Sequence, residues 1–272
     1  IQNVIKTTAA QNAGHLRLKK TCRDLRYFVD QERPSANINS IQITHAENII
    51  ELRLNTGEDS VTLEYRNTEN GYTLRAEFNG TDNTRVVEGT NYIDAMCHEF
   101  GMLMKHQKSV MEKVCFVIHD DDSEVLWQKI RETVEKGKLF RAKAVSMATP
   151  NLPIVLSFLP CFEPKTLQSI RILGSLGVDI TVVADSIQWK SAKSGSVFGY
   201  TIQNAVKNFL HFNIFTGYTD GLTKDDLVQI KDTLLRSPDF LSGLLSFTPL
   251  LYQKELFSLL GPHCFLQEGK RT

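Results

Sequence analysis

The chain has 272 residues, 42% of them hydrophobic, and is long enough to bury one large core or two ordinary ones. Its 31 lysines and arginines equal its 31 aspartates and glutamates, so no overall positive field draws it to nucleic acid or anionic lipid. Five widely spaced cysteines without a C-x-x-C pair exclude a disulfide framework and a zinc ribbon, and indicate a reducing, intracellular setting.

Residues 1–33 predict a basic, helical segment. Its apolar residues Leu18, Cys22 and Leu25 recur at intervals of four and three, which places them on one stripe of a helix. On this pattern alone, the segment is an ordinary amphipathic helix that packs on its own domain and turns its basic face to solvent. Because the chain begins at Ile1 with an amphipathic pattern already under way, we expect its natural start to lie upstream.

From residue 38 to residue 87 the hydrophobic period changes to two. Segments such as VTLEY (61–65) and YTLRAEF (72–78) alternate apolar with polar residues and are separated by turn-rich pieces. The pattern predicts an antiparallel β-meander with one apolar face, followed by a closing helix at 90–106. We assign residues 34–109 to this domain.

From about residue 110 onward, strands alternate with helices. We assign residues 110–260 to an α/β domain and residues 261–272 to a tail. The alternation predicts mainly parallel strands with helices covering at least one face. The apolar run at 152–162 is shorter than the roughly 18 residues that a membrane helix needs, so no membrane partner is expected. The predicted strands lie near 114–118, 141–147, 167–172, 179–183, 209–215 and 242–247.

One short segment of this domain is similar to a repeat motif. Leu167, Ile170 and Ile172 form a single L-x-x-I-x-I arrangement, which is typical of the strand of a leucine-rich repeat. The parallel sheet could therefore be curved like a leucine-rich-repeat solenoid. Together, the patterns predict an α+β fold with N-terminal helices, an antiparallel meander and strand-helix units that form a mainly parallel sheet.

No motif indicates catalysis, a cofactor or a metal. His98 and Glu99 begin like a zinc-protease helix, but Met102 stands where the second histidine is required. His98 and His106 alone would bind zinc poorly without further ligands. The acidic run at 119–124 could hold a divalent cation, but it is better explained as the cap of the following helix. Phosphate-binding glycine loops and a G-x-S-x-G elbow are missing from the sequence, so we expect a non-catalytic protein with no cofactor and no metal site.

One of the two tryptophans, Trp189, lies in the basic stretch IQWKSAKS (187–194). An aromatic among lysines could stack on nucleic-acid bases. It could equally be the inner residue of a short helix. In a helix over 186–194, Lys190 and Lys193 point away from the side of the tryptophan. We therefore predict that Trp189 is largely buried and that the stretch binds no nucleic acid.

Four segments between residues 152 and 247 resemble the FTH domain, also called DUF38, of the nematode F-box A proteins. They are VLSFLPCFEPKTLQSIRI (155–172), IQWKSAKS, NFLHFNIF (208–215) and TKDDLVQIKDTLLRSPDF (223–240), in the order and spacing of the family. The resemblance implies an α/β domain that binds another protein. It marks five signature residues, for which we expect a structural role: Leu159, Leu167, Ile170, Trp189 and Phe212.

The N-terminal segment resembles part of an F-box. HLRLKKTCRDLRYFVD (15–30) looks like the second half of one and IQNVIKT (1–7) like part of the first, although the leucine-proline start is absent. The resemblance implies the substrate-recruiting adaptor of a Skp1-cullin-F-box ubiquitin ligase, which docks on a Skp1-like protein and presents an unidentified target protein in the cytoplasm or nucleus. The alternative is an FTH-type interaction module without functional Skp1 docking. Candidate residues for the F-box core or the Skp1 contact are Val4, Ile5, Leu16, Leu18, Cys22 and Leu25.

Overall fold

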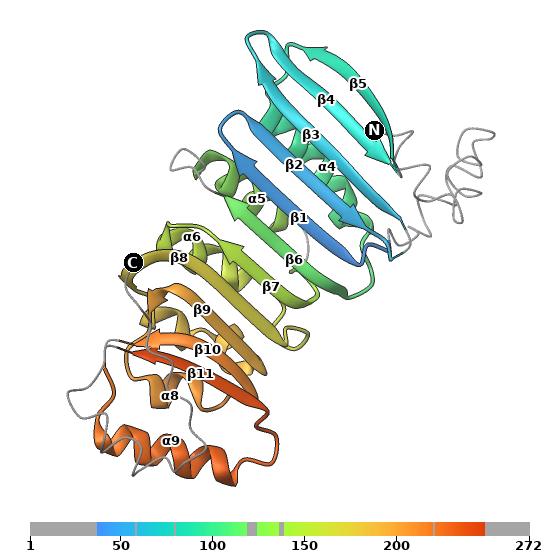
Figure 1. Cartoon of the computed structure of the whole chain (residues 1–272). Helices are drawn as coiled ribbons and strands as arrows, with labels where there is room; N and C mark the ends of the chain where they lie inside the picture. Colours follow the sequence, from blue (N-terminus) through green and yellow to red (C-terminus); the bar gives the residue numbers. More distant parts are fainter. Residues whose placement is uncertain are drawn as a thin grey trace.

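The computed structural model describes residues 37–57, 59–78, 80–118, 124–135, 139–219 and 221–247. Within these residues, 11 strands form one continuous sheet. Figure 1 shows the sheet from one side, with several of the helices behind it. The fold is mixed α/β, antiparallel in its N-terminal part and parallel in its C-terminal part.

The N-terminal part of the sheet is the predicted β-meander. Each strand pairs antiparallel with the next. Buried residues alternate with half-buried or exposed residues along the first four strands, as the period of two predicts, whereas the fifth is exposed along nearly its whole length. The strands are β1 (Ser40–Ala46), β2 (Ile49–Asn55), β3 (Ser60–Thr68), β4 (Gly71–Phe78) and β5 (Thr81–Glu88).

Helix α4 (Tyr92–His106) follows the meander, as predicted. The side-chain oxygen of Asn91 accepts the backbone N–H groups of Ile93 and Asp94 at 2.8 and 3.3 Å. These two bonds satisfy donors that the first turn of a helix leaves unpaired. One face of α4 packs on β2 and β3. Its buried residues are Tyr92, Met96, Cys97, Phe100 and Leu103.

Strand β6 (Met111–Ile118) joins the two halves of the sheet. It lies beside β1 and runs parallel to it, with Val114 opposite Ile41. β1 is thus antiparallel to β2 on one side and parallel to β6 on the other. The domains predicted at 34–109 and 110–260 therefore meet within one sheet, and their boundaries remain predictions.

The chain then alternates strands with short helices, and strands β6 to β11 are all parallel to their neighbours. The described helices lie on one face of the sheet (Figure 1). The elements are α5 (Glu124–Glu135), β7 (Ala142–Ala148), α6 (Leu152–Phe158), η2 (Leu159–Cys161), β8 (Ser169–Asp179), η3 (Thr181–Asp185), α7 (Ile187–Ser191), β9 (Ser194–Thr201), α8 (Ala205–Phe209), β10 (Ile214–Thr219), α9 (Lys224–Arg236) and β11 (Ser242–Phe247). The strand order is β11-β10-β9-β8-β7-β6-β1-β2-β3-β4-β5.

Two of the predicted strands are wrong. Most of the segment 179–183 belongs to η3, because the carboxylate of Asp179 accepts the N–H of Thr181 at 2.8 Å and ends β8 there. The segment 209–215 is mostly the end of α8 and a turn, and β10 begins only at Ile214. β9 was not among the predicted strands. The other four predictions correspond to β6, β7, β8 and β11.

The buried residues of the parallel strands lie in rows across the sheet. Val114, Val145 and Ile170 stand opposite one another in successive strands, and all three are buried. Leu167 and Ile172 are buried as well, so the whole L-x-x-I-x-I arrangement faces the core. Curvature of the leucine-rich-repeat kind remains a prediction.

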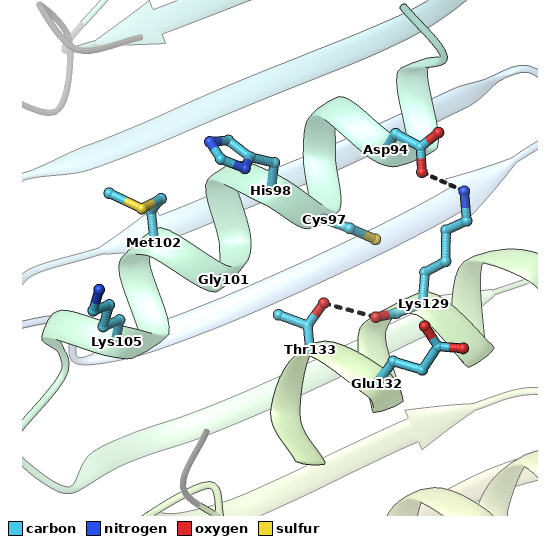
Figure 2. Close-up of a pocket in the computed structure, with 9 residues that line it drawn as sticks. All are labelled: Asp94, Cys97, His98, Gly101, Met102, Lys105, Lys129, Glu132 and Thr133. Atoms are coloured by element: carbon cyan, nitrogen blue, oxygen red, sulfur yellow. Dashed lines mark hydrogen bonds and ion pairs between the residues drawn. The ribbon is translucent and has the colours of Figure 1, made fainter. Parts of the chain in front are cut away.

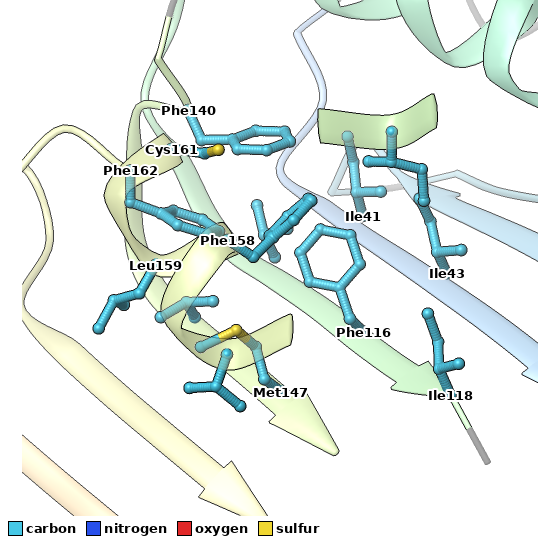
Figure 3. Packing of buried hydrophobic residues seen from close by; sticks show 14 of the residues in the cluster. Ile41, Ile43, Phe116, Ile118, Phe140, Met147, Phe158, Leu159, Cys161 and Phe162 are labelled. Atoms are coloured by element: carbon cyan, nitrogen blue, oxygen red, sulfur yellow. The ribbon is translucent and has the colours of Figure 1, made fainter. Parts of the chain in front are cut away.

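An aromatic cluster fills the core where the two halves meet (Figure 3). The ring of Phe158 on α6 lies edge-on to Phe116 of β6, with centroids 4.7 Å apart, and to Trp127 of α5 at 4.9 Å. Phe140 and Phe162 stack at 5.0 Å. Each such pair adds about 0.5–1.5 kcal/mol beyond the burial of its area. The cluster therefore binds the helices firmly to the centre of the sheet.

Candidate interaction surface

The face of the sheet that the described helices leave uncovered is the candidate functional surface, and we call it the open face (Figure 1). Side chains there alternate with buried ones: Gln42 and Thr44 are half-buried, whereas Ile41 and Ile43 are fully buried on the helix side. Parallel sheets normally have both faces covered by other elements. A parallel face that the described residues leave uncovered is therefore a candidate surface for contacts with other protein groups.

The meander half of the open face is charged. Arg53 pairs with Glu51 at 2.9 Å, and Arg75 pairs with Asp82 at 3.0 Å. A shallow hollow of about 320 Å³ lies among these side chains. Exposed ion pairs of this kind contribute about 0–1 kcal/mol each, so the network specifies the polarity of the surface more than its stability. The hollow is lined by Glu51, Arg53, Ser60, Thr62, Glu64, Arg75 and Glu77.

The parallel half of the open face has a different character. Large apolar side chains are exposed on three adjacent strands: Phe198 of β9 is 40% exposed, Ile214 of β10 39% and Leu244 of β11 60%. The guanidinium carbon of Arg171 on β8 lies 5.1 Å from the centre of the Phe198 ring. Small hydroxyl residues stand between these side chains. Across β8 to β11, this half is therefore a mainly apolar surface with one prominent cation.

The helix side carries a shallow groove of about 430 Å³ between α4 and α5 (Figure 2). Lys129 of α5 forms an ion pair with Asp94 of α4 across it. The helices approach closely at Gly101, where an added Cβ would lie 2.9 Å from the Cγ2 atom of Thr133. Cys97 points from α4 toward α5 (Figure 2). Burial raises the pKa of its thiol to about 12, so it stays protonated and is a poor nucleophile and metal ligand at neutral pH.

The residues considered for metal binding do not form a site in the described part of the chain. His98 lines the groove and His106 ends α4, but no three His, Cys, Asp or Glu residues in that part are arranged to hold a metal ion. The acidic run at 119–123 lies outside the described residues. Burial also raises the pKa of the Cys161 thiol, to about 11. Among the described helices, none combines the length and apolar character needed to cross a bilayer.

Trp189 is fully buried, in agreement with the burial predicted from its spacing. Its ring lies edge-on to Phe212 at 4.9 Å, and its indole N–H donates to the carbonyl oxygen of Asn208 at 2.9 Å. Helix α7 is shorter than the predicted 186–194, because the chain is already extended at Ala192 before it enters β9. Lys190 points outward and donates to the carbonyl oxygen of Asp185 at 2.9 Å. The stretch IQWKSAKS thus anchors a core.

The other four signature residues are also in the core. Leu159, Leu167, Ile170 and Phe212 are each at most 2% exposed. His211 lies next to this core, and its ring nitrogen Nε2 is 3.0 Å from the carbonyl oxygen of Trp189. Burial lowers the pKa of His211, which the hydrogen bond partly opposes. The signature residues hold the strands in place and are too buried to contact a partner. Their standing as a family signature remains a prediction.

The six F-box candidates lie outside the described residues, so their predicted role is untested. They are Val4, Ile5, Leu16, Leu18, Cys22 and Leu25.

Sequence reasoning missed the exposed residues of the parallel half. Arg171 stands between the buried Ile170 and Ile172, and Phe198 follows the buried Val197. Strict alternation around these positions was the available signal that both side chains point away from the core.

Comparison with known proteins adds two findings. Residues 124–263 match the family model described as the FTH domain. The chain is also similar to F-box A protein 224 of Caenorhabditis elegans, with 21% identity over 232 residues that cover 82% of this chain and 58% of the relative. The chain thus spans less than two thirds of the length of this relative. No solved structure matches the chain. The FTH match includes the Trp189 core and the whole parallel sheet from β7 to β11.

Proposed function

Because the chain belongs to the FTH-domain family of nematode F-box A proteins, we propose that it is a substrate-recruiting adaptor of a Skp1-cullin-F-box ubiquitin ligase. In this role, residues 1–33 dock on a Skp1-like protein and the FTH domain binds a target protein. The adaptor performs no chemistry itself and requires neither cofactor nor metal. Its place of action is the cytoplasm or the nucleus, where such ligases work.

The observation that carries this proposal is the FTH match at 124–263 combined with an uncovered parallel face in the same region. An adaptor must present a target in one orientation, which requires a binding surface on rigid elements. The open face meets this requirement, because each strand from β7 to β10 is hydrogen-bonded on both sides. The name of the C. elegans relative, an F-box A protein, supports the assignment of the N-terminal segment to an F-box.

A pull-down with purified Skp1 tests the docking step, using both the 272-residue chain and the full-length product of its gene. Leu16→Asp and Leu25→Asp should abolish binding, because helix-docking interfaces depend on a few buried apolar anchors that each cost about 2 kcal/mol or more when truncated. Lys19→Ala and Lys20→Ala should have little effect, because charges at the rim of an interface contribute little affinity.

Capture of Skp1 that is lost only in the aspartate variants would support the adaptor role. Circular dichroism of each variant must show that the remaining fold is intact. If neither form of the wild-type protein captures Skp1 at micromolar concentration while both are folded, the ligase role is wrong. The alternative function, an FTH-type interaction module without Skp1 docking, would then apply.

A further inference from the structure

Six side chains on the parallel half of the open face form one contiguous surface, which we call the Phe198 patch. Arg171, Ser196, Thr216 and Leu244 lie in a row across four strands, because each stands opposite the next in the sheet register. Phe198 and Ile214 lie on the same face but on opposite sides of this row, because Phe198 follows Ser196 by two residues and Ile214 precedes Thr216 by two. Neighbouring strands are about 4.8 Å apart, so the row extends over roughly 14 Å. The patch consists of Arg171, Ser196, Phe198, Ile214, Thr216 and Leu244.

The charge of this region has one sign. The strand segments 169–173, 194–198, 214–218 and 242–246 contain a single charged residue, Arg171. Among the described residues, no carboxylate pairs with it, and its guanidinium lies over the ring of Phe198. In the meander half, by contrast, the exposed arginines Arg53 and Arg75 are already paired with carboxylates. A partner that carries negative charge therefore complements the patch and is attracted less to the paired arginines of the meander half.

The contact between Arg171 and Phe198 favours a carboxylate as the group that is bound. A guanidinium that lies over an aromatic face keeps its N–H groups at its edge, where they can donate two parallel hydrogen bonds to one carboxylate. The ring also restricts the rotamers of the arginine, so less conformational freedom is lost on binding. Around this group, the exposed surfaces of Phe198, Ile214 and Leu244 can receive apolar side chains of the same partner.

The small side chains in the patch determine how closely a partner can approach. Ser196 and Thr216 separate Arg171 from Leu244 and leave the sheet backbone near the surface. A chain segment could therefore lie across the strands, with its backbone hydrogen-bonded to the two hydroxyl groups. The site thus combines one fixed cation, exposed apolar side chains and hydroxyl groups along a line.

We propose that the Phe198 patch is the target-binding site, and that it takes a protein segment in which an aspartate or glutamate lies close to large aliphatic or aromatic side chains. This inference rests on the proposed function, since it names the surface through which the adaptor holds its target. Charge complementarity to Arg171 argues for an acidic segment of a partner protein. Residues 248–272, in which Glu255 precedes Leu256 and Phe257, and a second copy of the protein are the alternative occupants that the test below distinguishes.

Selection from a phage-displayed library of random peptides, panned on the purified 272-residue chain, tests the proposal. Enriched peptides should place an acidic residue within a few positions of leucine, isoleucine, phenylalanine or tryptophan. Their synthetic forms should bind in fluorescence anisotropy, and Arg171→Glu should weaken binding by about tenfold or more, because a charge-assisted contact is replaced by repulsion. Arg171→Lys should give an intermediate loss, because it keeps the charge but not the two-pronged geometry.

Matched variants separate the patch from general effects of charge. Arg66→Glu reverses another exposed arginine on the open face, outside the patch, and should change affinity by less than about twofold. Phe198→Ser should weaken binding, whereas Val86→Ser, at the exposed edge strand β5, should not. Melting curves should be nearly unchanged for the arginine variants and Val86→Ser, because these side chains are exposed. Phe198 is only 40% exposed, so Phe198→Ser should lower the Tm modestly and must be assayed well below its own transition.

Several outcomes would overturn the proposal. These are no enrichment over a blank surface, enriched peptides without acidic residues, and an equal loss of affinity in Arg171→Glu and Arg66→Glu. A photo-crosslinking residue at position 198 identifies the occupant directly, and capture of residues 248–272 or of a second copy would also contradict it.

The Skp1 pull-down distinguishes failure of this inference from failure of the proposed function. Arg171→Glu should bind Skp1 as the wild type does. If peptides bind through the patch but Skp1 is not captured, the ligase role is wrong and the binding site stands; the reverse result removes the site and leaves the ligase role.

Discussion

Replacing Gly195 of β9 by alanine should destabilise the protein through a steric clash in the Trp189 core. An added Cβ would lie 2.3 Å from the Cε2 atom and 2.5 Å from the Cζ atom of the Phe212 ring. The ring has little room to withdraw, because its centroid is 4.9 Å from that of Trp189 and 3.9 Å from that of His211. The Phe212 ring therefore fits in this position only because residue 195 has no side chain.

The size of the effect follows from two opposing terms. Overpacking a well-packed core costs about 1–3 kcal/mol, and the upper part of this range applies when several atoms of a confined ring are hit. Alanine in place of glycine restores about 0.4–1 kcal/mol by restricting the unfolded chain. We expect a net loss of about 1–2 kcal/mol, which corresponds to a fall in Tm of about 2–8 °C for a protein of this size.

Urea unfolding of Gly195→Ala, Phe212→Leu and the double variant measures this clash. Leucine in place of the phenylalanine leaves room for the new methyl group, so the double variant should be at least about 1 kcal/mol more stable than the sum of the two losses predicts. Gly221→Ala is the matched control; nothing lies within 4 Å of its added Cβ, so it should leave stability unchanged or raise it by up to about 1 kcal/mol. Losses that add to within about 0.3–0.5 kcal/mol would refute the reasoning, because they would mean that the two side chains do not meet.

Two further predictions concern buried groups. Trp189→Phe should cost about 1–3 kcal/mol in urea unfolding, because it leaves the buried carbonyl oxygen of Asn208 without its donor, whereas Ile187→Ala, at a 63% exposed position, should cost under about 0.5 kcal/mol. Burial raises the pKa of the Cys97 thiol from 9.0 to about 12, so between these pH values the unfolded state loses a proton that the folded state keeps. Stability should therefore fall as the pH rises through this window, by up to about 1.4 kcal/mol per pH unit, and Cys97→Ala should remove that part of the slope; an unchanged slope would contradict the assignment.

The elements that could be predicted from the sequence are those whose pattern depends on one face alone. In the first six residues of β3 and along most of β4, every second residue is buried, and the apolar residues Val61 and Leu63 indicate that alternation directly. The closing helix was predictable for a similar reason, since Asn91 caps it and its apolar residues share one side.

β9 and β10 could not be predicted, because their buried positions are partly glycine. Gly195 and Gly217 contribute no hydrophobic signal, and the volume above them is filled by Phe212 and Phe209 from neighbouring segments. The pattern therefore assigned strand character to the phenylalanines instead of to the glycines that accommodate them. Only the tertiary fold shows that phenylalanines from outside these strands fill the core above the two glycines.

The candidate site was predictable in part. Alternation in β8 and β9 indicates that Arg171 and Phe198 leave the core, but it says nothing of their contact, which depends on the register that sets Arg171 opposite Ser196. Nor does the sequence specify that the described helices all lie on one side. A covering helix is predicted from its own apolar stripe, and that stripe does not indicate on which face of the sheet the helix packs.

The position of β1 in the middle of the sheet has a consequence for the order in which the protein is made. Strands β2 to β5 leave the ribosome directly after β1, and each can pair at once with the strand before it. From β6 onward, each new parallel strand again finds its template in the strand just completed. The exception is the pairing of β1 with β6. Ser40 stands opposite Lys113, and the rest of the meander and α4 lie between these two residues in the sequence. Contacts between distant parts of a chain are slow to form. The closure of β6 on β1 is thus the step at which the nascent protein waits longest, with one edge of β1 still exposed and open to wrong partners.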